Sequence, residues 1–107
     1  MTSAITSPEI ATKHPSEETW FQFNYEPILG EGETMLDTGL IAIYADKVGL
    51  TFAQEQAVIE PTRVSIFVQE GVDGVKYNLT CEADTTLDGI TKFQRRVIVG
   101  QIRVRST

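Results

Sequence analysis

The sequence predicts an all-β fold, a single antiparallel β-sandwich of about six or seven strands. Short segments alternate between apolar and polar residues with the period of two that turns one face of a strand toward a core. Turn residues separate these segments at near-regular spacing, and no long segment has the periodicity of an amphipathic helix. Strand number and chain size fit the immunoglobulin-like class best, and a small antiparallel β-barrel is the alternative.

The length of 107 residues suits one domain with one hydrophobic core. Residues 1–18 have little apolar content, so we interpret them as an extended polar N-terminal arm, disordered alone or ordered against a partner. Residues 19–107 then form the β-sandwich domain. The N-terminus lacks the pattern of a signal peptide and no run is long enough to span a membrane, so we expect no membrane partner.

The first strand of the sandwich is predicted from Thr19 to Tyr25. Phe21, Phe23 and Tyr25 share one face of this strand, and we expect that face in the core. Trp20 lies on the opposite face. A tryptophan in that position packs under an arm or at an interface more often than it binds a ligand.

The middle of the chain contains one clear strand and one ambiguous segment. Pro27 ends the first strand because it lacks a hydrogen-bond donor, and the next strand runs from Thr34 to about Asp46, with Gly39 marking a β-bulge. The ambiguous segment is Leu50–Ile59, whose propensities for helix and strand are balanced. We expect a strand or irregular crossing there, with a helical turn as second choice, closed by Pro61.

A glycine-containing turn at Gly71–Gly74 separates two strongly patterned segments. Arg63–Gln69 is rich in β-branched residues, and Val75–Ala83 alternates strictly, with its apolar positions all on one face. Two such segments around a short turn predict a β-hairpin. Among the apolar positions is Cys81, which we expect to be buried as a small hydrophobic residue.

The last predicted strand, or pair of strands, covers Ile90–Val104 after a turn at Leu87–Gly89. Val97, Ile98 and Val99 break the strict alternation in this segment. The break predicts a β-bulge, or burial on both faces of the strand, near Gly100.

The charge of the chain is distributed unevenly. The formal net charge is −6, but residues 1–88 carry all fifteen acids and only four bases, whereas residues 89–107 carry five bases and no acid. A basic strand in an acidic chain is a candidate nucleic-acid patch. The acidic body repels phosphate, however, so we expect these bases to pair with acids of the same sheet or of a partner subunit, and we expect no nucleic acid.

Cysteine and histidine offer no site for chemistry. The chain has one of each, so it forms no intramolecular disulfide, and the single cysteine indicates an intracellular origin. His14 lies in the polar arm without a second histidine or a cysteine nearby, and we therefore expect no metal. Cys81 has no base beside it in the sequence and is not expected to act as a nucleophile.

The carboxylates are also better explained as surface groups than as catalysts. Glu31 and Glu33, or Glu82 and Asp84, fall in turns and on strand faces that water should reach, and not in the apolar pocket that a catalytic acid–base pair needs. A calcium site involving Glu82, Asp84 and Asp88 lacks EF-hand spacing and is a minor alternative. We therefore expect no catalytic residue, no cofactor and no enzymatic activity.

A series of short motifs resembles that of a known group of proteins. In order, the motifs are Lys13-x-Pro15, Phe21-x-Phe23, Leu29, Gly32-Glu33-Thr34, Val64-x-Ile66-x-Val68, Gly71-x-x-Gly74-x-x-Tyr77-x-Leu79-Thr80 and a final basic strand. This order, from about Lys13 to Val104, is similar to that of small tail-fibre adaptors and related virion proteins of tailed bacteriophages.

The resemblance implies a non-enzymatic assembly module with an immunoglobulin-like sandwich fold. Its partners would be other virion proteins, namely tail or portal-neck ring proteins and the tail fibre, with several copies in a symmetric assembly. It would reside in the tail or neck of the virion after synthesis in the host cytoplasm. As a hypothesis, Met1–Ser16 and Lys92–Arg105 contact partners. The candidate contact residues are Lys13, His14, Pro15, Trp20, Lys92, Arg95, Arg96, Arg103 and Arg105.

Two other functions remain open from the sequence. A different virion role, head-tail completion or capsid decoration, would use the same sandwich. A carbohydrate-binding or other ligand-binding module would need exposed aromatic residues, for which Trp20 is the candidate.

Overall fold

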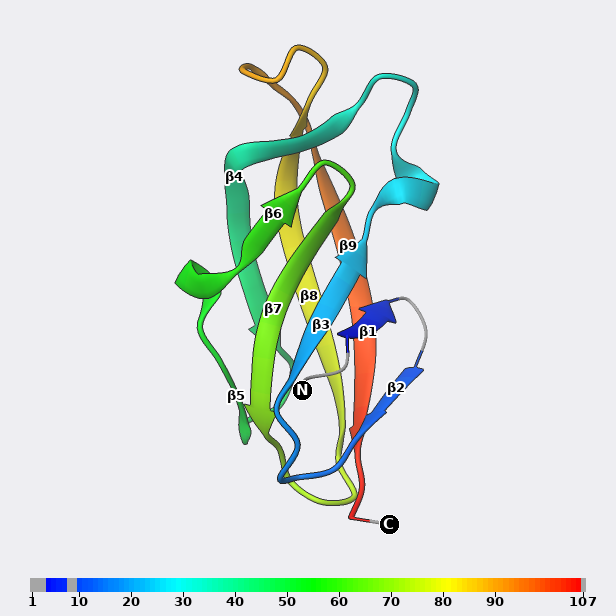
Figure 1. The fold of residues 1–107 in the computed structure, drawn as a ribbon, viewed down its shortest axis with the longest axis vertical. Coiled ribbons are helices and arrows are strands. Elements are labelled where there is room, and N and C mark those ends of the chain that lie inside the picture. The colour runs from blue at the N-terminus through cyan, green and yellow to red at the C-terminus, as the bar shows by residue number, and fades with distance from the viewer. Residues whose placement is uncertain (1–3, 8–9, 107) are drawn as a thin grey trace.

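The computed structural model describes residues 4–7 and 10–106 and shows two β-sheets packed face to face (Figure 1). The first sheet has the order β1-β3-β7-β5, with β6 also paired to β7, and the second has the order β2-β9-β8-β4. The first contains β1 (Ala4–Ser7), β3 (Thr19–Asn24), β5 (Leu50–Phe52), β6 (Val58–Glu60) and β7 (Arg63–Glu70). The second contains β2 (Ile10–Lys13), β4 (Thr34–Ala45), β8 (Lys76–Thr86) and β9 (Lys92–Val104).

The predicted all-β sandwich is confirmed, and the sheets do not close into the alternative barrel. The described residues contain nine strands instead of six or seven, and two 3₁₀ helices, η1 (Glu26–Ile28) and η2 (Gln54–Gln56), lie between them. The additional strands are short ones at the sheet edges. The molecule is elongated, with extents of 45 × 27 × 23 Å, and its two ends are formed by loops (Figure 1).

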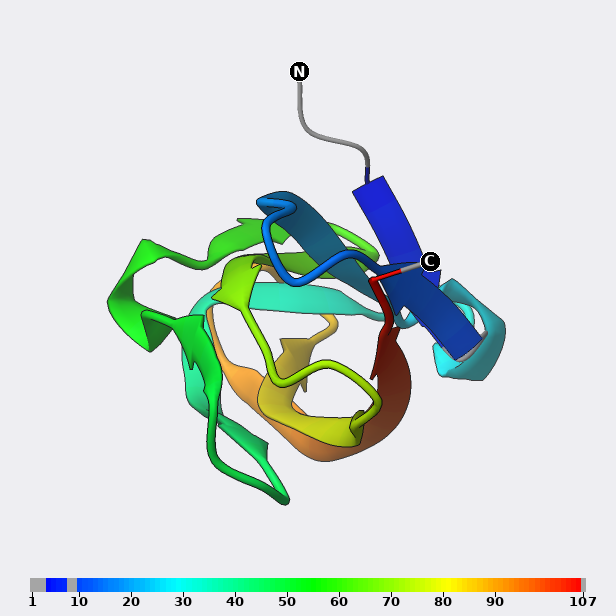
Figure 2. The same ribbon diagram turned by 90° about the horizontal axis from the view of Figure 1, so that it is seen from below.

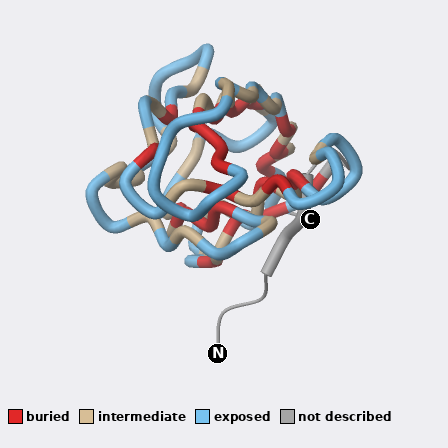
Figure 3. Tube along the Cα trace, turned by 90° about the horizontal axis from the view of Figure 1, so that it is seen from above, coloured by how far each residue is buried: buried red, intermediate tan, exposed pale blue. Residues whose placement is uncertain are grey.

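The core lies between the two sheets and follows the period-two pattern of the sequence. Phe21, Phe23 and Tyr25 are fully buried, as predicted, while Trp20 on the opposite face is only partly buried. The alternating positions of β7 and β8 supply most of the remaining core, namely Val64, Ile66, Val68, Tyr77, Leu79, Cys81 and Ala83. Viewed from above, the buried residues line the interior and the exposed ones form the loops (Figure 3).

The N-terminal segment contributes a strand to each sheet. β1 pairs in parallel with β3, and β2 pairs in parallel with β9, so the chain changes sheet between Ser7 and Ile10. Figure 2 shows both strands along one side of the sandwich. Ala11 and Lys13 of β2 are buried, because they continue the inward alternation of the second sheet. The boundary between an N-terminal arm and the domain, expected after residue 18, stays a prediction. Residues 1–3 and 8–9 of the predicted arm lie outside the described part of the chain.

The predicted hairpin between β7 and β8 is wrong. β7 pairs with β3, β5 and β6, whereas β8 pairs with β4 and β9, so Gly71–Val75 crosses from one sheet to the other. Both strands carry a continuous apolar face, and the two faces meet across the core. The turn itself needs left-handed backbone, as expected, with φ of 107° at Gly71 and 85° at Gly74.

Tyr77 fixes this crossing with its hydroxyl group. Tyr77 Oη donates to Val48 O and accepts from Val72 N, both at 3.0 Å, while the ring is fully buried. A buried tyrosine near the start of this strand that hydrogen-bonds upstream backbone is a feature of immunoglobulin-like sandwiches. A second buried hydroxyl, that of Tyr25, donates to Cys81 O at 2.8 Å and so joins the two sheets.

Two further expectations for single segments were tested. The bulge predicted at Gly39 is confirmed by register shifts on both sides of Leu40, and a Cβ at Gly39 would lie 2.9 Å from Asp84 O. The bulge or two-sided burial predicted at Val97–Val99 is wrong. Those residues pair without a shift, Ile98 faces the core, and Val97 and Val99 face outward and are half exposed.

The ambiguous segment Leu50–Ile59 combines both expected conformations. It forms β5, the 3₁₀ helix η2 and β6, and both strands pair with the same edge of β7. The helical turn interrupts what would otherwise be one edge strand. This outcome agrees with the balanced propensities of the segment.

Candidate protein-binding surfaces

One edge of the second sheet is open over most of β9. β8 pairs with one side of β9 along its length, but on the other side β2 reaches only Gln101–Val104. Within the described ranges 4–7 and 10–106, no strand pairs with the remaining edge, Lys92–Val99, which we call the open edge. Unpaired backbone donors and acceptors of this kind can accept a strand from another chain.

Apolar side chains accompany the open edge. Val97 and Val99 lie on the outer face of β9, and Phe93 is near its start; the three are exposed by 52%, 51% and 50%. Next to them Pro27 and Ile28 of η1, with Asn24, form the other wall of a groove of about 230 Å³ along Val97–Val99. Half-exposed apolar residues beside unpaired backbone are typical of a protein-binding surface more than of a solvated sheet face.

The opposite edge of the same sheet is closed by a side chain. On β4, Ile43 N donates to Gln54 Oε1 at 3.0 Å, and Gln54 Nε2 donates to Ile41 O at 3.1 Å. The amide of Gln54 therefore takes the place of a neighbouring strand at this point. Met35 N, near the start of β4, donates to Pro61 O at 2.8 Å, so this edge is also covered at a second point.

Three of the predicted contact residues are engaged within the chain. Lys92 Nζ lies 3.9 Å and Arg95 Nε 3.0 Å from Asp84 Oδ1, so both bases form ion pairs with an acid of the neighbouring strand. Arg96 makes a two-pronged interaction with Glu33, with Nη2 donating to Oε1 at 2.8 Å and Nε to Oε2 at 3.2 Å. These pairs agree with the expectation that basic residues of the last strand neutralise acids of the same sheet.

Glu33 forms its ion pair with Arg96 at one end of the core. Its side chain is almost fully buried and also accepts hydrogen bonds from Gly30 N, Thr85 Oγ1 and Gln94 Nε2. The hydrogen bonds from Arg96 are the main reason that the pKa of Glu33 is lowered from 4.5 to about 2, against the opposing effect of burial. The carboxylate therefore stays ionised and holds β9 to the start of β4.

The two remaining basic residues of β9 and its C-terminal end have a different environment. Arg103 and Arg105 lie at the other end of the sandwich, where they line a hollow together with Lys76 and Gly74. None of these three bases forms an ion pair with a described residue. Lys76 was not among the predicted contacts, because only its pairing with Arg103 across β8 and β9 reveals the cluster.

The predicted contacts in the arm separate into a buried and an exposed group. Lys13 is fully buried, and its Nζ donates to the backbone carbonyls of His14, Pro15 and Glu70, so its side chain holds the β2–β3 connection to the end of β7. Burial lowers its pKa. Lys13 is therefore corrected from a partner contact to an internal clamp. His14 is exposed and Pro15 is half-buried, so both keep surface for a partner.

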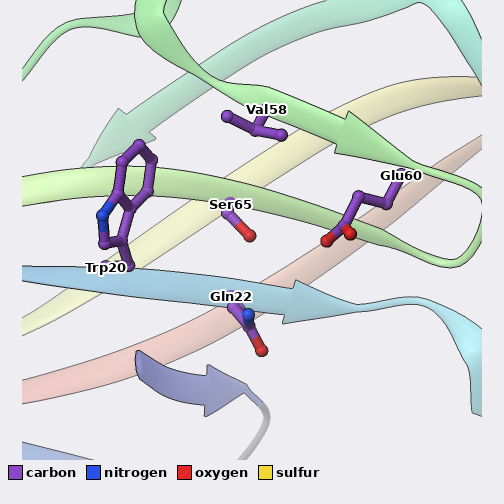
Figure 4. Close-up of a pocket in the computed structure, with 5 residues that line it drawn as sticks. All are labelled: Trp20, Gln22, Val58, Glu60 and Ser65. Atoms are coloured by element: carbon purple, nitrogen blue, oxygen red, sulfur yellow. The ribbon is translucent and has the colours of Figure 1, made fainter. Parts of the chain in front are cut away.

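Trp20 lies on the outer face of the first sheet, on the opposite face of β3 from Phe21 and Phe23. Its ring packs at an angle on Phe67, with 5.4 Å between ring centroids. With Val58, Gln22, Glu60 and Ser65 it lines a shallow hollow of about 250 Å³ (Figure 4). The small side chain of Ser65 makes the floor of the hollow, a feature that the sequence pattern did not reveal.

No arrangement suited to nucleophilic or metal chemistry is found in the described part of the chain. Cys81 is buried, and burial raises the pKa of its thiol to about 11, which keeps it protonated. Residues 4–7 and 10–106 contain no group of three or more His, Cys, Asp or Glu side chains placed to hold a metal ion. None of the helices in these residues is long and apolar enough to cross a membrane.

Comparison with known proteins gives one family. Residues 13–99 match the family model Gp77, described as podophage GP4 fiber-tail adaptor protein gp77. No curated protein matches the chain. Among solved structures, the solution structure of amebosin is similar with a TM-score of 0.44 and 10% sequence identity, covering 98% of this chain and 99% of that chain.

Proposed function

Because the chain belongs to the Gp77 family of podophage fiber-tail adaptor proteins, we propose that it attaches tail fibres to the phage tail through protein–protein contacts. Its place is then in the virion, at the tail or the portal-neck complex, and its action is structural, not enzymatic. Ring proteins of the tail or neck and the fibre itself are the proposed partners, in several copies and without nucleic acid or membrane.

The open edge of β9 is the observation that carries the attachment mechanism. A partner strand can extend the second sheet there by main-chain hydrogen bonds, which need no particular sequence. Specificity for one partner would come from side chains of the partner strand that enter the groove beside Val97–Val99 and cover Phe93. Gln54 covers the edge of β4 at Ile41 and Ile43, which favours strand addition at β9.

A reconstitution experiment tests this proposal. Purified chain is mixed with tail particles lacking fibres and with separate fibres, and electron microscopy counts fibre-bearing tails. We expect the wild-type chain to restore fibres and Val97→Lys to reduce its affinity by about tenfold or more, because a charge enters the apolar surface. Val58→Lys is the matched control, since Val58 is exposed to a similar extent on the other sheet.

The outcomes of this experiment test the adaptor function and the attachment surface separately. If the wild-type chain joins no fibres to tails, the adaptor function itself is wrong. If it does so and Val97→Lys acts like Val58→Lys, the open edge is not the attachment surface. Incorporation into heads or neck without fibres would favour the other virion roles, head-tail completion or capsid decoration.

A second candidate function is supported by the hollow at Trp20. An aromatic ring beside a carboxylate, an amide and a hydroxyl group is a combination that sugar-binding surfaces use. Saturable binding of a bacterial surface polysaccharide, lost in Trp20→Ala and kept in Tyr44→Ala, would support ligand binding. Binding that is absent, or equal in both variants, would remove this candidate.

A further inference from the structure

The nine Lys and Arg residues fall into two groups according to their surroundings. Five are engaged within the chain: Lys13 with backbone carbonyls, and Lys47, Lys92, Arg95 and Arg96 with carboxylates. Four form no ion pair with any residue in the described ranges, namely Arg63, Lys76, Arg103 and Arg105. Three of these four line the same hollow of about 370 Å³ at one end of the sandwich, which we call the basic hollow.

The backbone around the basic hollow is held in place. Lys76 and Arg103 are paired residues on the neighbouring strands β8 and β9. Arg105 N donates to Lys13 O at 2.8 Å, and Gly74 N donates to Val104 O at 2.7 Å, so the two chain segments that flank the hollow are tied to the sheet. A ligand would thus meet three positive charges on a prearranged backbone, and only their side chains would need to be ordered.

This clustering is unfavourable for the isolated chain. Like charges directly opposite each other on antiparallel strands destabilise a sheet, and no acid in residues 4–7 and 10–106 forms an ion pair with these bases. Asp73, next to Gly74, accepts hydrogen bonds from Ser106 N at 2.9 Å and Ser106 Oγ at 3.0 Å instead of pairing with a base. Cations around a hollow that no described residue neutralises are expected where an anion from another molecule binds.

We propose that the basic hollow docks an acidic segment of a partner protein, whose carboxylates bind between Lys76, Arg103 and Arg105. The proposal deepens the adaptor function and depends on it, because the partner is one of the virion proteins that the adaptor joins. Arg103 and Arg105 lie beyond the residues that match the family, so this site is inferred from the structure of this chain alone.

Charge decides between an acidic protein segment and nucleic acid. A long polyanion that reached the hollow would also lie along the acidic body of a chain with net charge −6, and would be repelled there. A short acidic segment brings a few carboxylates to the hollow and can continue over the sheet with neutral residues. The arrangement therefore favours a protein partner.

A peptide-binding assay on the full chain tests the site directly. The probe is a fluorescein-labelled hexaglutamate peptide, and its anisotropy is followed at about 0.15 M salt, where long-range attraction is screened. We expect saturable binding that weakens about tenfold in Arg103→Glu and in Arg105→Glu, and by less than about twofold in Arg63→Glu. Arg63→Glu is the matched control, because it changes the net charge equally at an unpaired base outside the hollow.

Two results would overturn the inference. One is hexaglutamate binding that is absent or equally affected by Arg103→Glu and Arg63→Glu. The other is that a short duplex DNA binds more tightly than hexaglutamate and loses this binding in Arg103→Glu and Arg105→Glu. That result would indicate a site for phosphate groups. The reconstitution experiment distinguishes the adaptor function from the docking site. If the wild-type chain attaches no fibres, the adaptor function is wrong. If fibre attachment is insensitive to Arg103→Glu, only the proposal for the basic hollow is wrong.

Discussion

At the scale of single residues, Glu33 gives the clearest dependence of stability on pH. Its folded-state pKa of about 2 lies below the ordinary value of 4.5, so its ion pair stabilises the fold fully above about pH 4.5. That contribution is lost as the pH falls through about 2. We expect Glu33→Gln to lower the free energy of unfolding by about 2 kcal/mol at neutral pH, because Arg96 loses its carboxylate partner.

Urea unfolding at a series of pH values measures this effect. The difference between wild type and Glu33→Gln should shrink as the pH falls from 4.5 toward 2, since Glu33 then becomes protonated and loses its charge. Glu31→Gln, at an exposed neighbouring position, removes the same charge and should leave stability nearly unchanged. A constant difference across the pH range would show that the ion pair is not its source.

The hydroxyl group of Tyr77 is expected to matter because two backbone groups depend on it. Tyr77→Phe leaves Val48 O and Val72 N without this partner and should lower the free energy of unfolding by about 1 to 2 kcal/mol. Tyr44→Phe removes an exposed hydroxyl group from the outer face and serves as the control. Thermal unfolding of both variants compares them, and equal midpoints would contradict a structural role for the buried group.

Residue environments were predictable where they depend on local alternation. The inward positions of β3 and β8 follow from a period of two, and the structure buries them. The pairing of Glu33 with Arg96 was not predictable, because it joins residues far apart in sequence and its acid was expected at the surface. Lys13 was misjudged for a related reason: a polar segment can still bury one lysine when three backbone carbonyls accept its hydrogens.

At the scale of strands, the closed edge of β4 depends on one side chain. Gln54→Ala removes both hydrogen bonds to β4 and exposes the backbone at Ile41 and Ile43. We expect a loss of about 1 kcal/mol in stability and the appearance of dimers at high protein concentration, because an unprotected edge can pair with a second copy. Sedimentation velocity detects the dimers.

Gln56→Ala is the matched control for this experiment. Gln56 belongs to the same 3₁₀ helix and is exposed, so its replacement should leave the chain in the wild-type association state. If both variants dimerise equally, helix η2 as a whole protects the edge and the amide of Gln54 does not. If neither dimerises, the edge is protected by another part of the fold.

Element positions were largely predictable, but their pairing was not. The strand segments starting at Thr19, Thr34 and Arg63 follow from composition and turn residues, and the structure places them there. The sequence around Gly71 suits a hairpin and a crossing between sheets equally well. The choice depends on which partners are available to β7 and β8 elsewhere, and a local pattern does not contain that information.

At the scale of the whole molecule, the N-terminal segment is expected to stabilise the sandwich even without a partner. Deleting residues 1–15 removes the pairing of β1 with β3 and of β2 with β9, together with the buried Ala11 and the Lys13 clamp. We expect the free energy of unfolding to fall by about 2 kcal/mol or more. Urea unfolding of the shortened chain provides the value.

Adding three alanines before Met1 changes the terminus without removing these contacts and is the control. An unchanged stability after the deletion would mean that residues 1–18 behave as an independent arm, as the sequence suggested. The overall charge separation was visible in the sequence, but the division of the bases into paired and unpaired ones appeared only when the strands were assembled.

The parallel pairing of β2 with β9 has a mechanical consequence. Because the two strands are parallel, the chain enters β2 at one end of the pair and leaves β9 at the opposite end. A pull on these two ends therefore loads all the hydrogen bonds of the pair at once, in shear. Separation then requires these bonds to break together, whereas a pair pulled from one end opens one bond at a time. In single-molecule stretching, a chain lacking residues 1–9, which keeps β2 but not β1, should therefore unfold at a higher force than the chain lacking residues 1–15. Resistance to a pull along this side of the sandwich thus depends on a strand of four residues.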